Sequence, residues 1–122
     1  MQKKISVIVV TRNEEKKLHS CLKALRAHFS DIWVVDSAST DKTRDIARSY
    51  GAHVVEFIWD RQGQRKYGWC LDHLEGLAEW VLFVDADEIM TDALAFEIKS
   101  MELKEAAYFI KSRYCVEGQI LK

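Results

Sequence analysis

The chain has 122 residues, which is enough for one domain with a modest hydrophobic core. Hydrophobic residues make up 48% of it and charged residues 30%, a balance typical of soluble globular domains. The formal net charge of -1 leaves no excess of lysine and arginine to neutralise phosphates, which argues against a nucleic-acid partner.

The three cysteines, Cys21, Cys70 and Cys115, lie far apart and form no Cys-x-x-Cys pair. This spacing argues against a structural zinc site and favours reduced thiols in a cytoplasmic protein. The first apolar run, Ile5–Val10, is too short for a signal-peptide core or a membrane span. We therefore expect a cytoplasmic protein without a transmembrane segment. Peripheral association with the inner face of a membrane stays open.

Apolar runs and helical patterns alternate along the chain. Continuous β-branched and apolar runs predict buried strands at residues 5–10, 32–36, 53–58 and 79–87. Apolar residues at helical spacing predict helices at residues 14–28, 39–51 and 62–77, and a fourth helix that begins at Thr91 or Asp92. A final alternating stretch, 106–116, predicts a strand at the edge of the sheet.

Several residues mark the ends and the apolar faces of these helices. Ser39 or Thr40 is expected to cap the second helix, and Gly51 is expected to end it. The apolar faces of the last two helices are carried by Trp69, Leu71 or Cys70, Leu74, Leu94, Phe96, Ile98 and Met101.

The alternation of strands and helices predicts an α/β fold, with a mainly parallel sheet and helices on both faces. No proline, low-complexity run or internal repeat marks a linker, so residues 1–122 are expected to form a single domain. In such sheets ligands bind beyond the carboxyl ends of the strands. The residues at those ends are therefore the candidates for a functional site.

Polar and acidic residues lie at the carboxyl ends of three of the predicted strands. They are Thr11–Glu14 at the end of the first strand, Asp36–Asp41 at the end of the second and Asp85–Glu88 at the end of the fourth. Strand ends are often polar, and Thr40 and Asp41 are equally well explained as helix caps. The glycine-rich phosphate loops of dinucleotide-binding and P-loop proteins do not occur at these positions. A bound phosphate would thus need another neutralising group, such as a divalent cation.

The segment Asp85-Ala86-Asp87 is the main candidate for binding that cation. In an extended chain residues two apart point the same way, so Asp85 and Asp87 are expected on one side and Ala86 on the other. Mg²⁺ and Mn²⁺ prefer oxygen ligands, and Mg²⁺ commonly takes one or two carboxylates together with phosphates and water. The same alternation turns Glu88 away from the pair, so Glu88 is not assigned as a general base.

Three stretches, "ISVIVVTRNEEKKLHSCLKAL", "IWVVDSASTDKTRDIARSYGAHVVE" and "EWVLFVDADE", resemble the family 2 glycosyltransferases of the GT-A fold. The resemblance runs from Ile5 to about Phe96, with the motifs in the family's order. It is closest to the bacterial branch that builds lipopolysaccharide cores and related surface glycans. It implies a Rossmann-like α/β unit that binds a nucleotide-diphosphate sugar.

The resemblance implies roles for residues near the nucleoside. Thr11, Asn13 and Glu14 match the segment that borders the base and ribose. Asp36 matches the aspartate that contacts the base, usually uracil. Ser37 stands where the commoner family pattern has a second acid, and the next residue, an alanine, replaces a glycine and is expected to alter the turn.

The resemblance also implies residues near the diphosphate. Asp85 and Asp87 match the metal-binding pair, with Asp85 commonly near the ribose and Asp87 ligating Mn²⁺ or Mg²⁺. Arg65 or Lys66 stands where the family places a basic residue near the nucleotide, and the choice between the two stays open.

The activity implied is inverting transfer of a sugar from a nucleotide-diphosphate sugar to a glycan or lipid-linked acceptor in lipopolysaccharide or other surface-polysaccharide biosynthesis. A UDP-sugar is the default donor, and GDP and dTDP remain alternatives. The family's catalytic domain is longer than this chain, so we expect the donor-binding half alone, without the general base. An exposed surface left by the other half makes a homodimer a reasonable expectation.

Three alternatives remain. A non-catalytic remnant that binds nucleotides or nucleotide sugars would share every donor motif. A phosphate-receiving signalling domain would need an acidic pair directly after the first strand and an aspartate that ends the third, which this sequence does not match. A nucleotidyltransferase would be expected to carry a glycine-rich opening loop, which is not found.

Overall fold

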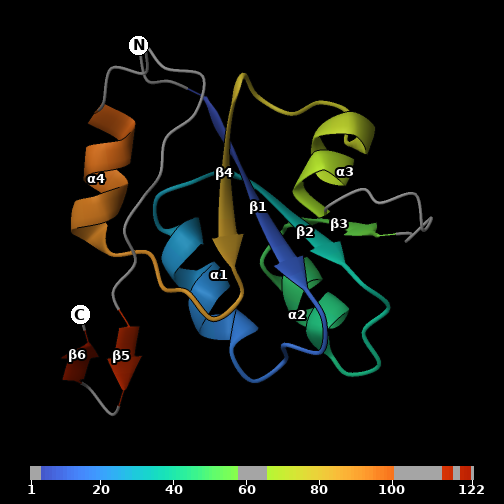
Figure 1. The fold of residues 1–122 in the computed structure, drawn as a ribbon, viewed down its shortest axis with the longest axis horizontal. Coiled ribbons are helices and arrows are strands. Elements are labelled where there is room, and N and C mark those ends of the chain that lie inside the picture. The colour runs from blue at the N-terminus through green and yellow to red at the C-terminus, as the bar shows by residue number, and fades with distance from the viewer. Residues whose placement is uncertain (1–3, 58–65, 101–113, 117–118, 122) are drawn as a thin grey trace.

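The computed structural model describes residues 4–57, 66–100, 114–116 and 119–121. In this part of the chain four strands form one parallel sheet in the order β3-β2-β1-β4, and two more form an antiparallel pair (Figure 1). In chain order the elements are β1 (Ile5–Thr11), α1 (Leu18–Arg26), β2 (Asp31–Asp36), α2 (Thr43–Ser49), β3 (His53–Glu56), α3 (Lys66–His73), β4 (Trp80–Asp85), α4 (Asp92–Ser100), β5 (Tyr114–Val116) and β6 (Gln119–Leu121).

The strand β1 lies between β2 and β4, because its run of valine and isoleucine suits a strand covered on both faces. It pairs in parallel with both neighbours. The register places Thr11 beside Asp36 and Val10 beside Asp85, so the carboxyl ends of the three strands lie at one edge of the sheet. The predicted α/β class and the predicted gathering of strand ends are both confirmed.

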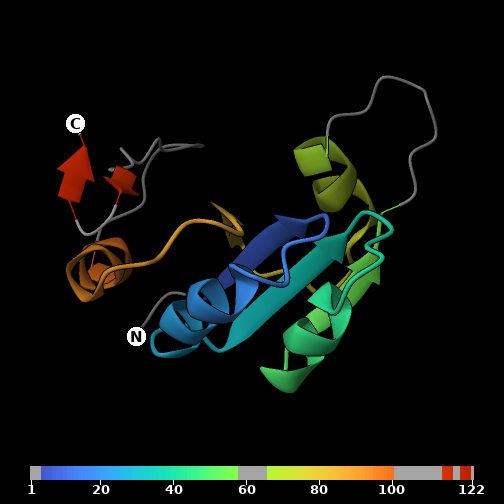
Figure 2. The ribbon, with the colours of Figure 1, turned by 90° about the horizontal axis from the view of Figure 1, so that it is seen from below.

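Successive side chains of β1 point to opposite faces of the sheet. Val7 and Val9 belong to a core that also contains residues of α1, α2 and α4, whereas Ile8 belongs to a second core with Trp69 and Cys70 of α3. Figure 2 shows α1 and α2 on one side of the sheet and α3 on the other. Helices therefore cover both faces, as the sequence predicts.

The helix α1 supplies the largest part of the first core. Its buried residues, Leu18, Cys21, Leu22 and Leu25, recur at intervals of three or four and so form one face of the helix. Each leucine is fully buried, and the burial of one such side chain contributes about 2 kcal/mol. This packing fixes α1, which follows the loop after β1, against the sheet.

The start of α1 differs from the prediction, because the chain forms a turn before the helix begins. The amides of Lys17 and Leu18 both donate to the Glu14 carbonyl, at 3.1 and 2.9 Å. The helix then begins at Leu18 rather than at Glu14. Glu14 therefore belongs to the strand-end loop and not to a helix.

The predicted cap of α2 is wrong. The helix begins at Thr43 after the cap residue Lys42, whose side chain makes no cap hydrogen bond. Ser39 and Thr40 lie before this point and bond to the loop after β1 instead. The predicted end is confirmed: Gly51 follows the helix with a φ of 74°, a conformation that glycine adopts without strain.

The predicted cap of α4 is confirmed, but part of its predicted face is wrong. The Thr91 hydroxyl oxygen accepts the Leu94 amide at 3.1 Å. Phe96 is 74% exposed, whereas Ala95 and Ile98 are buried against the first core. Since Ala95 and Ile98 are three residues apart they share a helix face, and Phe96 falls outside it.

The inward-facing residue of α3 is Cys70 and not Leu71. Cys70 is fully buried, whereas Leu71 is 54% exposed. The described end of the last predicted strand, Tyr114–Val116, does not join the main sheet but pairs antiparallel with Gln119–Leu121. Residues 58, 62–65, 101 and 106–113 of the predicted elements lie outside the described residues.

The turn after β2 contains a non-glycine residue in the left-handed region, since Ala38 has a φ of 49°. The replacement of glycine by alanine thus leaves the turn in a conformation that glycine favours. We expect Ala38→Gly to raise the free energy of unfolding by about 0.5 to 1 kcal/mol, measured by urea denaturation. The control is Ala27→Gly, at a φ of -64°, which should be destabilising. Equal losses in both variants would contradict the strained turn.

Candidate functional site

The strand order reverses between β1 and β4. From β1 the chain proceeds to β2 and β3 on one side, and β4 then pairs with the other side of β1. In open parallel sheets ligands bind at the carboxyl ends of the strands where such a reversal occurs. The arrowheads of β1 and β4 end at the same edge in Figure 1. The loops that leave these two strands therefore form the candidate site.

The strand β4 ends at Asp85, and residues 85–88 form a turn in which the Glu88 amide donates to the Asp85 carbonyl at 3.0 Å. The Glu88 carboxylate accepts the Asp85 amide at 2.9 Å. The predicted orientation of Glu88 is therefore wrong: Glu88 folds back onto Asp85 because the segment turns. Asp85 and Asp87 are nevertheless both exposed while Ala86 is buried, so the two aspartates do face solvent.

Cys21 of α1 supports this turn from the core side. Its thiol donates to the Asp85 carbonyl at 3.6 Å, and its side chain is fully buried. Burial raises the pKa of the thiol from 9.0 to about 12, with smaller contributions from the carboxylates of Glu88, Asp87, Asp85 and Glu14. Because Glu14 follows β1 and the other three residues lie at or just after the end of β4, the acidic groups of both strand ends raise the pKa of one thiol.

Asp36, the last residue of β2, has no exposed surface. Its Oδ1 accepts the hydroxyls of Thr11 and Ser39, at 2.7 and 2.5 Å, and its Oδ2 accepts the Ser39 amide at 2.9 Å. Arg44 Nε lies 3.8 Å from the same Oδ2. Thr11 is itself 2% exposed. The carboxylate of Asp36 therefore joins the ends of β1 and β2 from the inside.

Asn13 joins the loop after β1 to the loop after β2. The main-chain amide of Asn13 donates to the Ser39 hydroxyl oxygen at 2.8 Å. The side-chain Oδ1 of Asn13 accepts the main-chain amide of Thr40, also at 2.8 Å. Asn13 has a φ of 52°, in the left-handed region that asparagine visits more readily than most residues. The two loops are thus held together by both main-chain and side-chain groups.

The start of α2 is tied to the same loop. The Glu14 amide donates to the Thr43 hydroxyl oxygen at 2.8 Å, and the Glu15 amide donates to Asp41 at 3.3 Å. The Lys42 amide donates to the Glu15 carboxylate at 3.0 Å. The Thr43 hydroxyl donates to Asp41, and this hydrogen bond is the main reason that the pKa of Asp41 lies below its usual value.

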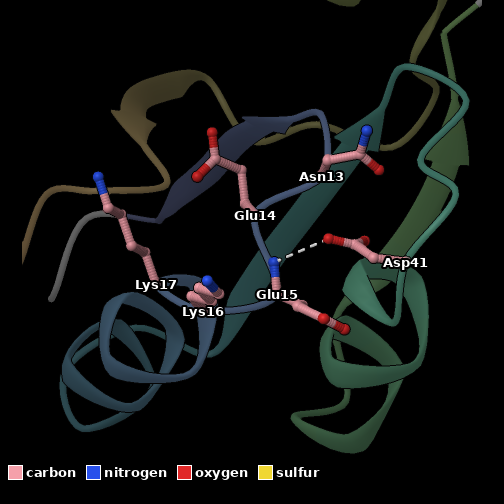
Figure 3. Close-up of a pocket in the computed structure, with 6 residues that line it drawn as sticks. All are labelled: Asn13, Glu14, Glu15, Lys16, Lys17 and Asp41. Atoms are coloured by element: carbon pink, nitrogen blue, oxygen red, sulfur yellow. Dashed lines mark hydrogen bonds between the residues drawn. The ribbon is translucent and has the colours of Figure 1, made fainter.

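A pocket of about 360 Å³ opens at these loops (Figure 3). The contact between the Glu15 amide and Asp41 crosses it, and the Glu14 side chain points away from Asp41. Acidic and basic groups are mixed in its walls. It is lined by Asn13, Glu14, Glu15, Lys16, Lys17 and Asp41.

The structure brings most of the predicted site residues to one edge of the sheet. These are Thr11, Asn13, Glu14, Asp36, Ser37, Asp85 and Asp87. The Ser37 amide donates to the Thr11 carbonyl at 2.9 Å, and the Ser37 hydroxyl is buried without a hydrogen-bond partner. Lys66 begins α3 and Arg65 lies outside the described residues, so the choice between them stays open.

Sequence reasoning missed two residues that contact the site from behind. The sequence indicates only a buried thiol at Cys21, and nothing in its helical pattern indicates its hydrogen bond to Asp85. Arg44 lies eight residues after the acidic end of β2, in the first turn of α2, and this spacing only weakly indicates an ion pair with Asp36. Both contacts depend on where the helices pack, and this is not visible in local sequence.

Within the described ranges, no three His, Cys, Asp or Glu side chains converge as if to enclose a metal ion. Asp85 and Asp87 instead present two exposed carboxylates at an open edge. This donor set fits Mg²⁺ or Mn²⁺, which are commonly held by one or two carboxylates with phosphates and water as further ligands. Asp85 and Asp87 thus match part of a metal site, and a bound ligand would supply further oxygen atoms to the ion.

The fold and the site together define an α/β protein that presents acidic and polar loops at the carboxyl edge of a parallel sheet. Residues 6–120 match the sequence model described as glycosyl transferase family 2, and the chain belongs to this family.

Similar proteins are about three times as long as this chain. An uncharacterized glycosyltransferase of Rickettsia bellii is 35% identical over 100 residues, which cover 81% of this chain and 33% of the relative. A 4,4'-diaponeurosporenoate glycosyltransferase of Staphylococcus haemolyticus is 34% identical over 99 residues, which cover 76% of this chain and 26% of the relative. The chain thus spans about a third or less of the curated relatives it matches.

The chain also spans only about a third of the length of two solved structures that it resembles. A crystal structure of S. aureus TarS 1-349 has a TM-score of 0.61 and 31% identity, with 78% of this chain and 31% of that chain covered. Glucosyl-3-phosphoglycerate synthase from Mycobacterium tuberculosis, in complex with Mg²⁺ and uridine diphosphate, has a TM-score of 0.56 and 26% identity, with 69% and 33% covered. The fold of this chain is therefore that of the GT-A glycosyltransferases, as the sequence resemblance implies.

None of the described helices combines the length and the apolar composition that are needed to cross a bilayer.

Proposed function

We propose that this chain is the nucleotide-sugar-binding unit of an inverting, metal-dependent glycosyltransferase. The observation that carries the proposal is the meeting of the β1 and β4 loops at the strand reversal, where Glu14, Asp85 and Asp87 present carboxylates in a family 2 chain. Glucosyl-3-phosphoglycerate synthase, a structural neighbour, has been crystallised with UDP and with Mg²⁺ or Mn²⁺. A UDP-sugar with one of these ions is therefore the proposed donor.

In this proposal Asp85 and Asp87 hold the ion beside the donor diphosphate. When bound, Mn²⁺ or Mg²⁺ supplies Lewis-acid stabilisation of the charge that develops on the departing nucleoside diphosphate. Glu88 orients the turn by accepting the Asp85 amide, and Cys21 holds it from the other side. The protein's own contribution at this end is to fix two exposed carboxylates at the edge of the sheet.

Asn13 and Glu14 border the nucleoside in this proposal, with Thr11, Asp36 and Ser37 behind them. Asp36 is fully buried, and its oxygens accept hydrogen bonds from Thr11 and Ser39, so in this proposal it holds the two loops together behind the nucleoside. A basic residue near the nucleotide, either Arg65 or Lys66, is part of the same proposal.

The proposed acceptor rests on the sequence resemblance and on the names of the relatives. The relatives include proteins named for 4,4'-diaponeurosporenoate and for glucosyl-3-phosphoglycerate, so acceptors differ among proteins that share this part of the fold. A glycan or lipid-linked acceptor in lipopolysaccharide or other surface-polysaccharide biosynthesis follows from the sequence resemblance. The cytoplasmic location, the association with a membrane and the homodimer remain predictions.

Calorimetric titration of UDP with and without Mn²⁺ tests the donor site. We expect Mn²⁺-dependent binding that Asp87→Asn weakens about tenfold or more, because one ligand charge is lost from a site with few ligands. The matched control is Asp72→Asn on the exposed surface of α3, which should leave the affinity unchanged.

Equal affinity for UDP in the wild type and Asp87→Asn would contradict the metal role. No binding of UDP, GDP or dTDP by the folded chain would contradict the donor site itself. Binding without hydrolysis or transfer of the sugar from a UDP-sugar would favour the alternative, a non-catalytic nucleotide-sugar-binding protein.

A further inference from the structure

Arg44, the second residue of α2, contacts three separate segments with one guanidinium group. Its Nε lies 3.8 Å from Asp36 Oδ2, its Nη2 donates to the Ser39 carbonyl at 3.1 Å, and its Nη1 donates to Glu56 at 3.3 Å. These partners are the last residue of β2, the loop after it and the last residue of β3. We propose that Arg44 is a positioning residue that holds the nucleotide-binding loops in place, an inference that rests on the proposed function.

The burial of Asp36 explains why a cation is needed here. A carboxylate with no exposed surface is costly unless it is hydrogen-bonded and paired. Thr11 and Ser39 supply neutral donors, and Arg44 supplies the positive charge. The Arg44 side chain is 38% exposed, so solvent screens part of this attraction. The planar fork of the guanidinium reaches three acceptors at once, and this geometry contributes to holding the loops in place as much as its charge does.

Ser39 connects Arg44 to the candidate site through hydrogen bonds. Its carbonyl accepts Arg44 Nη2, and its hydroxyl donates to Asp36 and accepts the Asn13 amide. Asn13 in turn accepts the Thr40 amide and directly precedes Glu14. A displacement of Ser39 therefore displaces the segment proposed to border the nucleoside, although Arg44 itself need not touch a ligand.

Arg48 provides a matched control on the same helix. It lies one turn after Arg44 and pairs only with Asp45 among the ion pairs of the described residues, at 3.4 Å, with both side chains largely exposed. An exposed pair of this kind contributes little. Truncation of Arg48 removes the same chemical group from α2 without touching the strand-end loops.

The test compares Arg44→Met, Arg44→Lys and Arg48→Met in the full 122-residue chain. The first measurement is amide hydrogen exchange without ligand. Arg44→Met is expected to speed exchange at the Asn13, Ser39 and Thr40 amides about tenfold, while the central amides of β1 keep their wild-type rates. Arg48→Met should change neither set. The selective change separates loop positioning from general loss of stability.

The second measurement is UDP affinity with Mn²⁺ at a temperature where all variants are folded. Arg44→Met is expected to weaken binding about tenfold, Arg44→Lys should recover part of the loss because the charge remains without the fork, and Arg48→Met should stay near wild type.

Unchanged exchange in Arg44→Met, or faster exchange spread equally over the loops and the core of β1, would overturn the positioning role. Faster loop exchange with unchanged UDP affinity would overturn its link to nucleotide binding. If the wild type binds no nucleotide while the selective exchange difference is present, the proposed function fails and the positioning of the loops stands.

Discussion

Replacement of Asp36 by alanine is expected to lower the free energy of unfolding by about 3 kcal/mol. The variant leaves the Thr11 hydroxyl and the Ser39 amide without their buried acceptor, and it leaves Arg44 without its buried partner. A buried donor that loses its acceptor costs about 1 to 3 kcal/mol, and the partial exposure of Arg44 limits the further loss. Urea denaturation followed by circular dichroism measures the change.

The control for this prediction is Asp45→Ala, which removes an exposed carboxylate from α2. It should alter the free energy of unfolding by less than about 0.5 kcal/mol. If Asp36→Ala were as mild as Asp45→Ala, the carboxylate at the end of β2 would not be the buried junction of the two loops.

Alkaline solution is expected to destabilise the protein through Cys21. The pKa of this thiol is about 12 in the folded chain and 9.0 when unperturbed, so between these values the unfolded chain releases a proton that the folded chain retains. The stabilising contribution is complete below pH 9 and is lost as the pH rises toward 12. The full difference of three pKa units corresponds to about 4 kcal/mol.

The measurement compares the free energy of unfolding of the wild type and Cys21→Ala at pH 8 and pH 10.5, in metal-free buffer with a reductant. Over this interval the wild type should lose about 2 kcal/mol more than the variant, because the variant lacks the titrating thiol. Parallel pH profiles would show that Cys21 ionises as easily in the folded chain as in the unfolded one.

The parallel sheet and its edge were predictable because they depend on regular patterns. Continuous apolar runs such as Ile5–Val10 define buried strands in almost any context, and alternation with helices fixes their parallel direction. The carboxyl ends of such strands must meet at one edge. Thr11, Asp36 and Asp85 were therefore placed correctly by chain order alone.

Local geometry at that edge was less predictable. The extended-chain rule misplaced Glu88, because a single hydrogen bond from its amide closes a turn that the residue types do not require. Ser39 looked like a helix cap because the same hydroxyl chemistry serves caps and loop contacts. Its actual partners, Asp36 and Asn13, are brought near only by the pairing of β1 with β2.

The face of α4 shows a third kind of failure. The apolar character of Leu94, Phe96 and Ile98 predicts that they share the buried face, yet the face packed against the core contains the small residue Ala95. Close packing of a helix on a sheet favours a small residue at the contact, and hydrophobicity alone does not rank the candidates. The sequence pattern therefore predicts the presence of the helix more reliably than it predicts which helix face packs against the core.

The bonds among Asn13, Ser39 and Asp36 also constrain how sequences of this kind can diverge. Each residue is a donor or an acceptor for at least one of the others, so a change at one position leaves a polar group unmatched at another. The two loops should accordingly be inherited and exchanged as a pair. A chimera that takes only one of them from a relative would combine halves of two different hydrogen-bond networks.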